Sequence, residues 1–240
     1  MKYFELVCTV FLKQDIEFKS SFEIISKYMS FTICSSPFKD IHESLDYKYY
    51  VFKSFYPIES DKVYKKGNIY EFTIRALNKE FVDMLSNSLR ENINNPFFQV
   101  LNTSKKVINQ FFITELYTVT PTIITTDSGL FWTMQKDGDI LRLQKQLHDN
   151  LEKKYKAFYD EEIQAEQNFI QLLEVKNRVP QNIEIKKDGK RVRFFGNKFK
   201  IVPNEDEVSQ KLAFLALGAG LGEKNSFGGG FCITGDKRWF

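Results

Sequence analysis

Histidine and cysteine are scarce in this 240-residue chain, which has two histidines and three cysteines. Cys8, Cys34 and Cys232 lie far apart, and the sequence contains neither a CxxC pair nor a Cys/His cluster. A zinc site and a disulfide framework are therefore not expected, and the chain fits a reducing cytosol. We accordingly expect neither a metal nor a cofactor.

Long apolar runs and a strong net charge are also missing. No apolar run approaches the 18 residues of a transmembrane helix, and acidic Glu5 stands where the core of a secretory signal would run. We therefore expect no membrane partner and a cytoplasmic location. The net charge is only +3, so any affinity for nucleic acid has to come from local patches.

The first half of the chain predicts a β-α-β-β-α-β order. Strands are expected where apolar residues alternate, and helices where they recur every three or four positions. Gly67-Asn68 is a hairpin signal. The expected elements are a strand over 2–12, a helix over 18–36, strands over 47–56, 63–66 and 69–76, a helix over 78–92, and strands over 97–101 and 107–113.

The second half repeats this order and predicts an α+β fold with two tandem ferredoxin-like domains, residues 1–115 and 116–240. The long helical stretch from Ile140 is expected to break near Asp160 and to continue through Phe169, Leu172 and Leu173. The other expected elements are strands over 116–125 and 129–135, a hairpin over 182–195, a strand over 199–202, a helix opened by the capping box Asn204/Glu207, and a last strand over 231–233.

Glycine is concentrated in one segment, because six of the 12 glycines fall between Gly218 and Gly230. Phosphate-binding loops of nucleotide sites run strand, glycines, helix. Here the order is helix, glycines, strand, which disfavours a nucleotide-binding regulator. The loop also contains Lys224, Asn225 and Ser226, and such a surface suits a polyanion. Close packing of the loop on a sheet is the alternative reason for so many glycines.

The spacing of these glycines resembles a known family. Gly220-x-Gly222, five residues, and Gly228-x-Gly230 before the last strand are similar to the motif of the CRISPR-associated endoribonucleases that cut precursor CRISPR RNA at its repeats, within the RAMP superfamily. The segment ending in Pro121, which opens the second domain, extends the resemblance. Gly229 departs from it, because family members usually have an apolar or aromatic residue there. The resemblance implies a metal-independent endoribonuclease in which the 2′-OH attacks the phosphorus.

The resemblance also implies catalytic residues. His42 follows the first expected helix, as the family's catalytic histidine does, and histidine suits acid–base work near neutral pH. Lys48 would stabilise phosphate charge, with Lys53 as a rival, and Tyr28 would position the sugar-phosphate, unless it is simply buried. The other histidine, His148, lies mid-helix, where a structural role is expected.

The expected RNA-binding surface has a second part, a basic hairpin. It could lie along an RNA stem, although charge runs are often only solvated faces. The expected partners are CRISPR repeat RNA, subunits of a CRISPR effector complex and a second copy of the chain. A non-catalytic RNA-binding RAMP subunit is the alternative function. The expected RNA-binding residues are Gly220, Gly222, Lys224, Asn225, Ser226, Gly228 and Gly230 in the loop, and Lys186, Lys187, Lys190, Arg191 and Arg193 in the hairpin.

Overall fold

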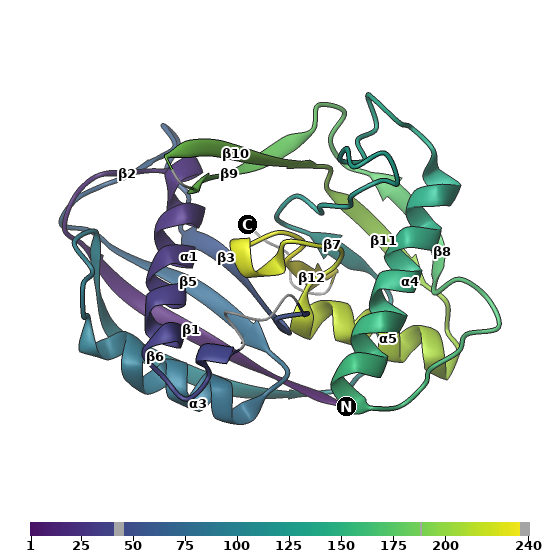
Figure 1. The fold of residues 1–240 in the computed structure, drawn as a ribbon, viewed down its shortest axis with the longest axis horizontal. Coiled ribbons are helices and arrows are strands. Elements are labelled where there is room, and N and C mark those ends of the chain that lie inside the picture. Colours follow the sequence, from purple (N-terminus) through teal and green to yellow (C-terminus); the bar gives the residue numbers. More distant parts are fainter. Residues whose placement is uncertain (41–45, 188, 236–240) are drawn as a thin grey trace.

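The computed structural model describes residues 1–40, 46–187 and 189–235 (Figure 1). The first half forms a four-stranded antiparallel sheet in the order β3-β5-β1-β6. A two-residue pairing of β2 with β4 stands apart from it. The elements are β1 (Lys2–Leu12), β2 (Ile16–Glu17), α1 (Phe18–Cys34), β3 (Tyr50–Tyr56), β4 (Val63–Tyr64), β5 (Ile69–Ala76), α3 (Lys79–Ser88), a 3-10 turn (Leu89–Glu91) and β6 (Phe98–Asn109).

Alternation along β1 builds the first core. Every second residue from Phe4 to Leu12 is buried, and these side chains pack with the apolar stripe of α1. The stripe faces the core because its residues recur every three or four positions and so lie on one helix face; they are Phe22, Ile25, Met29 and Ile33. Helices α1 and α3 cover the same face of the sheet (Figure 1). The expected strand and helix at the start of the chain are both confirmed.

The second half forms another four-stranded antiparallel sheet, in the order β12-β7-β11-β8, with α4 and α5 packed together. Its core contains Leu143, Leu147 and Leu151 of α4. The elements are β7 (Leu116–Thr118), α4 (Ile140–Tyr159), β8 (Ile170–Val175), β9 (Gln181–Lys187), β10 (Lys190–Gly196), β11 (Phe199–Pro203), α5 (Glu207–Ala219), a 3-10 turn (Asn225–Phe227) and β12 (Cys232–Thr234).

Strands β9 and β10 form a separate hairpin that crosses from the second half to the first (Figure 1). Ile183, Ile185 and Phe194 of the hairpin belong to the first half's core, where β9 packs against α1. The backbone N–H of Lys186 donates to Glu23 of α1 at 2.9 Å. The hairpin therefore braces the two halves against each other.

A buried arginine makes a second connection between the halves. Arg75 on β5 pairs with Glu5 on β1 at 2.8 Å and donates to the carbonyl of Cys232, on β12, at 2.6 Å. It also donates to the carbonyl of Leu217, on α5, at 3.3 Å. The guanidinium lies 4.5 Å from the centre of the Phe231 ring, which adds a cation–π contact.

Three sequence predictions of secondary structure are wrong. Phe169, Leu172 and Leu173 do not continue a helix: Asp160 ends α4 in a left-handed conformation, and Ile170–Val175 is strand β8. The strands expected over 97–101 and 107–113 form the single strand β6, whose polar middle is tolerated because β6 is a half-exposed sheet edge. The turn at Gly67 forms, but β4 pairs with β2 rather than with β5.

Two smaller corrections concern the second half. Of the strands expected over 116–125 and 129–135, only Leu116–Thr118 is a strand, and the rest is held by isolated bridges such as Thr125 to Phe131. The cap of α5 is Asp206, whose carboxylate accepts the N–H of Ser209 at 2.9 Å, rather than Asn204. Asn204 instead donates to the carbonyl of Asn168 at 2.7 Å.

Candidate active site

A cavity of about 1490 Å³ lies between the two halves of the chain. Its walls come from distant segments: the residues on either side of 41–45, the end of β5 with the start of α3, residues 124–125, the inner face of α4, the end of β9 and the glycine-rich loop. Its lining includes Asp40, Asp46, Lys48, Gln146, Asn150, Lys153, Lys187, Gly222, Glu223, Lys224, Asn225 and Ser226.

Lysines give this cavity its cationic character. Lys48, Lys153, Lys187 and Lys224 all line it, against Asp40, Asp46 and Glu223. Burial lowers the pKa of Lys48, and the nearby Asp46 carboxylate acts in the opposite direction. A cluster of ammonium groups in a hollow is suited to a phosphodiester, because each is a compact positive charge.

The Glu223 carboxylate is engaged by the protein. The Glu223 side chain accepts the backbone N–H of Thr125 at 2.9 Å and its hydroxyl at 2.8 Å. Lys224 lies 3.8 Å from the same carboxylate. Glu223 thus fixes the loop to the 122–126 segment and leaves less negative charge facing the cavity.

The glycine-rich loop is shaped by close packing. Gly222 has a φ of +69°, and a Cβ there would lie 2.6 Å from the carbonyl oxygen of Ile123. The backbone N–H groups of Glu223 and Gly230 donate to Ile123 and Pro121 at 2.8 and 2.9 Å. These two amides are therefore occupied within the protein and are not free to bind a ligand. Close packing, which the sequence analysis gave as the alternative reason for so many glycines, accounts for the glycine at this position.

Lys154 lies beneath this loop, and the sequence analysis missed it. Its side chain is 2% exposed, and its ammonium donates to the carbonyls of Gly220 at 2.9 Å and Gly222 at 2.7 Å and to Asn225 Oδ1 at 2.8 Å. Burial lowers its pKa to about 7, while the Cys232 thiol and Glu223 favour the charged form. A lysine on the apolar stripe of α4, three residues after Leu151, was the available signal.

The same helix supplies two further groups that the sequence did not assign to the site. Gln146 and Asn150 line the cavity one turn apart on α4, a helix that was expected to have only a structural role. The Gln146 side chain donates to the carbonyl of Thr125 at 3.4 Å. Helix α4 is therefore both a core element and a wall of the cavity.

The structure brings together only part of the predicted site. Lys48, Lys187, Gly222, Lys224, Asn225 and Ser226 all line the cavity. His42 lies outside the described residues, but the residues that flank its segment, Asp40 and Asp46, both line the cavity. Lys48 itself precedes β3 by two residues instead of opening the strand.

Tyr28 faces away from this cavity, into the core of the first half. Its ring is 6% exposed, and its hydroxyl donates to the carbonyl of Leu89 at 2.7 Å. Burial raises its pKa to about 12. This geometry contradicts the expectation that Tyr28 contacts the sugar-phosphate and agrees with the alternative of simple burial.

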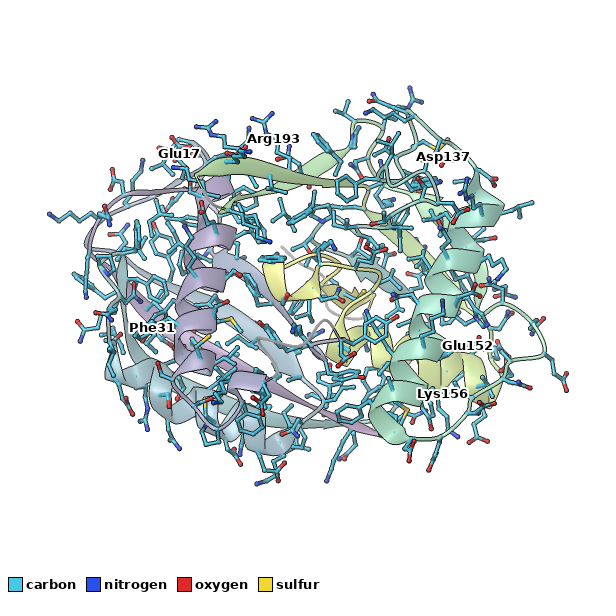
Figure 2. All side chains as sticks on the ribbon, in the orientation of Figure 1. Glu17, Phe31, Asp137, Glu152, Lys156 and Arg193 are labelled. Carbon is cyan, nitrogen blue, oxygen red and sulfur yellow. The ribbon has the colours of Figure 1, made fainter. Side chains whose placement is uncertain are left out.

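The basic hairpin has its apolar side against α1 and its charged side outside. Arg193 and Arg191 both pair with Glu184, at 2.8 and 3.5 Å, and Arg193 points outward from the top of the molecule (Figure 2). Of the five predicted hairpin residues, only Lys187 lines the cavity. Gly220, Gly228 and Gly230 of the loop, and Lys186, Lys190, Arg191 and Arg193 of the hairpin, are not among its lining residues.

His148 is structural, as expected. Its Nδ1 accepts the backbone N–H of Phe169 at 3.1 Å, and its Nε2 lies 3.1 Å from Glu152. The ring stacks on Phe169 and holds the start of β8 against α4.

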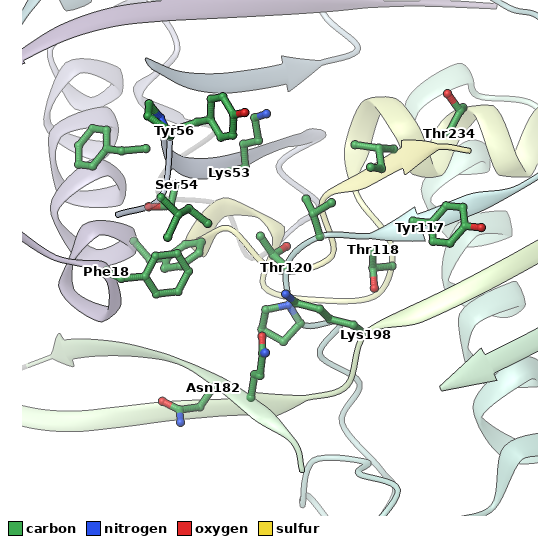
Figure 3. A pocket seen from close by; sticks show the side chains of 18 of the residues that line it. Phe18, Lys53, Ser54, Tyr56, Tyr117, Thr118, Thr120, Asn182, Lys198 and Thr234 are labelled. Carbon is green, nitrogen blue, oxygen red and sulfur yellow. The ribbon is translucent and has the colours of Figure 1, made fainter. Parts of the chain in front are cut away.

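A second cavity of about 1050 Å³ lies between β3 and β7, bordered by the hairpin (Figure 3). It contains Lys53, the rival of Lys48, and Lys198, whose pKa burial lowers. The Lys53 ammonium lies 5.7 Å from the centre of the Tyr56 ring (Figure 3). Lys48 and Lys53 therefore line different cavities, and only Lys48 shares one with the glycine-rich loop.

The described part of the chain contains neither a candidate metal site nor a candidate membrane-spanning helix. No group of three or more histidine, cysteine, aspartate or glutamate residues there is placed to hold a metal ion. No helix of residues 1–40, 46–187 or 189–235 is long and apolar enough to cross a membrane.

Residues 109–233, more than half of the chain, match the family model of the C-terminal part of the CRISPR-associated protein Cas6. The chain belongs to the Cas6 family. The resemblance seen in the glycine spacing is thereby confirmed, and the matched region contains the glycine-rich loop and ends inside β12.

Relatives of the chain are similar over nearly their whole length. It is 28% identical to the CRISPR-associated endoribonuclease Cas6 2 of Methanocaldococcus jannaschii, covering 91% of this chain and 94% of the relative. Among solved structures, a CRISPR-associated protein Cas6 has a TM-score of 0.68 at 22% identity, covering 97% of this chain and 99% of that one. A Cas6-related protein of Pyrococcus furiosus has a TM-score of 0.70 at 15% identity, covering 98% and 100%. The mixed α/β fold with antiparallel sheets is therefore the Cas6 fold.

Proposed function

We propose that this chain is an endoribonuclease that cuts CRISPR repeat RNA without a metal ion. One observation supports this most directly: a cationic cavity in a Cas6-family chain is lined by the glycine-rich loop, by Lys48 and by both flanks of the His42 segment. The similarity to a protein named as a Cas6 endoribonuclease supports the same reaction class. The expected enzyme class agrees with this family.

The proposed reaction uses the RNA's own 2′-OH. A base removes its proton, the 2′-oxygen attacks the phosphorus, and the bond to the 5′-oxygen breaks as an acid donates a proton to that oxygen. The products are a 2′,3′-cyclic phosphate and a 5′-hydroxyl. His42 acts as the base or the acid, because histidine exchanges protons near neutral pH. Lys48 stabilises the extra negative charge on the phosphorus oxygens in the transition state.

The RNA is held by the groups that share the cavity with Lys48. Lys224 and Ser226 of the loop, Lys187 of the hairpin and Lys153 of α4 lie around it and would contact successive phosphates. The outward-facing Arg191 and Arg193 extend the cationic surface along the hairpin. We assign Tyr28 to the core and not to the reaction, because its hydroxyl is already engaged with Leu89.

The topology supports two tandem ferredoxin-like domains, residues 1–115 and 116–240. In each half, the first strand of a β-α-β-β-α-β series lies between the third and the fourth, as in the orders β3-β5-β1-β6 and β12-β7-β11-β8. The β9–β10 hairpin is an insertion before β11 of the second series. Effector-complex subunits and a second copy of the chain remain predicted partners alongside the RNA.

Cleavage of the repeat RNA from the same genome in excess EDTA tests the proposed function. Wild type should cut once, a substrate with a single 2′-deoxy at the cut site should resist, and His42→Ala should lose at least about 100-fold in rate, the lower range for one acid–base group. Tight binding without cutting by wild type would favour the non-catalytic RAMP subunit instead. Equal cutting by both proteins would remove His42 from the mechanism.

Two lysine variants separate the rival cations. Lys48→Met should slow cutting at saturating RNA, while Lys53→Met should leave that rate close to wild type, because Lys53 lines the other cavity. A larger loss in Lys53→Met than in Lys48→Met would transfer the charge-stabilising role to the second cavity.

A further inference from the structure

The ammonium of Lys154 connects helix α4 to the interior of the glycine-rich loop. It donates to the carbonyl oxygens of Gly220 and Gly222, on the first limb of the loop, and to the Asn225 side-chain oxygen on the second limb. All three distances lie between 2.7 and 2.9 Å, so each donor hydrogen of the ammonium has its own acceptor.

Asn225 extends this connection to the end of the loop. While its Oδ1 accepts from Lys154, its Nδ2 donates to the carbonyl of Gly229 at 2.9 Å and to that of Leu221 at 3.3 Å. One buried cation and one amide thus join residues 220–222 to residues 225–229. The cavity-facing part of the loop presents Lys224, between these limbs, and Ser226, on the second limb.

The burial of Lys154 is not explained by stability alone. Moving an ammonium out of water costs several kcal/mol even after relaxation, and its carbonyl partners are neutral. The charged or polarisable groups that face it are Glu223, Cys232 and the Tyr47 ring, whose centre is 5.9 Å from the ammonium. A methionine would fill the same space without that cost, but it could not hold three acceptors in fixed directions.

We infer that Lys154 is a positioning residue, which holds the two limbs of the glycine-rich loop so that Lys224 and Ser226 face bound RNA; this inference rests on the proposed function. Lys154 does not touch the RNA in this arrangement, because loop residues separate it from the cavity. Its effect reaches the substrate only through the backbone of residues 220–229.

Lys154→Met and Lys154→Arg test this role, with Lys145→Met as the matched control. Lys145 lies on the same helix, is exposed, and pairs only with Asp149 among the described residues, at 2.5 Å. The measurements are hydrogen exchange of the amides of residues 221–230, the dissociation constant for repeat RNA with a 2′-deoxy at the cut site, and the single-turnover rate at saturating cleavable RNA.

We expect Lys154→Met to loosen the glycine-rich loop and to weaken RNA binding, with little change in the saturated cleavage rate. In Lys154→Met, the loop amides should exchange at least about tenfold faster and the dissociation constant should rise about tenfold, the loss of one hydrogen bond to a charged group. The saturated cleavage rate should stay within about threefold of wild type. Lys154→Arg keeps the charge and several donors and should recover most of the affinity. Lys145→Met should match wild type in all three measurements.

Other outcomes would overturn the positioning role of Lys154. Unchanged exchange in residues 221–230 would show that the loop holds its shape without Lys154, and equally faster exchange along the whole chain would show a merely structural role. If Lys154→Met does not fold, Asn225→Ala breaks the same link without removing the ammonium and is judged by the same exchange criterion. If wild type fails to bind repeat RNA, the proposed function fails, while the exchange measurement still decides the role of Lys154.

Discussion

Replacing Gly222 by alanine tests whether close packing shapes the loop. The substitution places a Cβ 2.6 Å from the backbone oxygen of Ile123, nearly an ångström short of ordinary contact, at a φ of +69°. Gly67→Ala is the matched control, because Gly67 has a φ of +84° but no heavy atom within 4 Å of an added Cβ. Both variants bear the cost of alanine at positive φ, about 1–2 kcal/mol, and both gain a few tenths from a less flexible unfolded chain.

The difference between the two variants isolates the contact. Relieving the overlap means moving the loop from the 122–124 segment, which strains the 2.8 Å hydrogen bond from Glu223 to Ile123. Overpacking of this kind costs about 1–3 kcal/mol, and the weakened hydrogen bond about 1 kcal/mol more. Gly222→Ala should therefore be about 2–4 kcal/mol less stable than Gly67→Ala, which lowers the Tm by roughly 5–12 °C in a chain of this size.

Urea and thermal unfolding followed by circular dichroism measure this difference directly. A gap below about 0.5 kcal/mol between the two variants, within the usual scatter of surface substitutions, would refute the packing argument. The glycine at position 222 would then be needed only for its backbone angle.

Three further predictions concern buried groups. Arg75→Met should destabilise the fold by about 3–5 kcal/mol, since it removes the guanidinium that pairs with the buried Glu5 carboxylate; adding Glu5→Gln should restore part of the loss in urea unfolding. Tyr28→Phe should cost about 1 kcal/mol, the hydrogen bond to Leu89, and leave RNA cutting unchanged; loss of cutting would restore its catalytic role. The pKa of Lys154 is about 7 in the fold against an ordinary 10.5, so the unfolded chain binds more protons between these pH values. The free energy of unfolding should rise with pH there, by at most ~1.4 kcal/mol per unit, and Lys154→Met should lack this rise.

Patterns that repeat along one element were sufficient to predict much of the fold. The alternation in β1 and the stripe in α1 each arise because one face of the element is buried. The spacing of the apolar residues in the sequence therefore shows which element forms. Strand β8 was mistaken for helix because Phe169, Leu172 and Leu173 fit the helical spacing, although Leu172 is an exposed residue of the strand. The middle of β6 was missed because its side chains face solvent, and an exposed sheet edge imposes no apolar pattern.

The site was predictable only where the family motif or a loop position marked it. Lys48 and Lys224 were identified, and the structure places both in one cavity. Lys154 was missed because its role depends on the carbonyls of Gly220 and Gly222, which come close to α4 only through the tertiary fold. A motif indicates which glycines matter, but it does not distinguish a backbone that touches RNA from one that packs on a neighbouring strand.

The assembly of the cavity from distant segments has a consequence for synthesis in the cell. Residues 222–227 emerge from the ribosome long after the segments around Asp40 and Lys48, and β12 must pair with β7 before the loop is anchored on both sides. A nascent chain that already displays the first sheet therefore has an open, unfinished site. A site built from both ends of the chain is complete only when the final strand has joined its sheet.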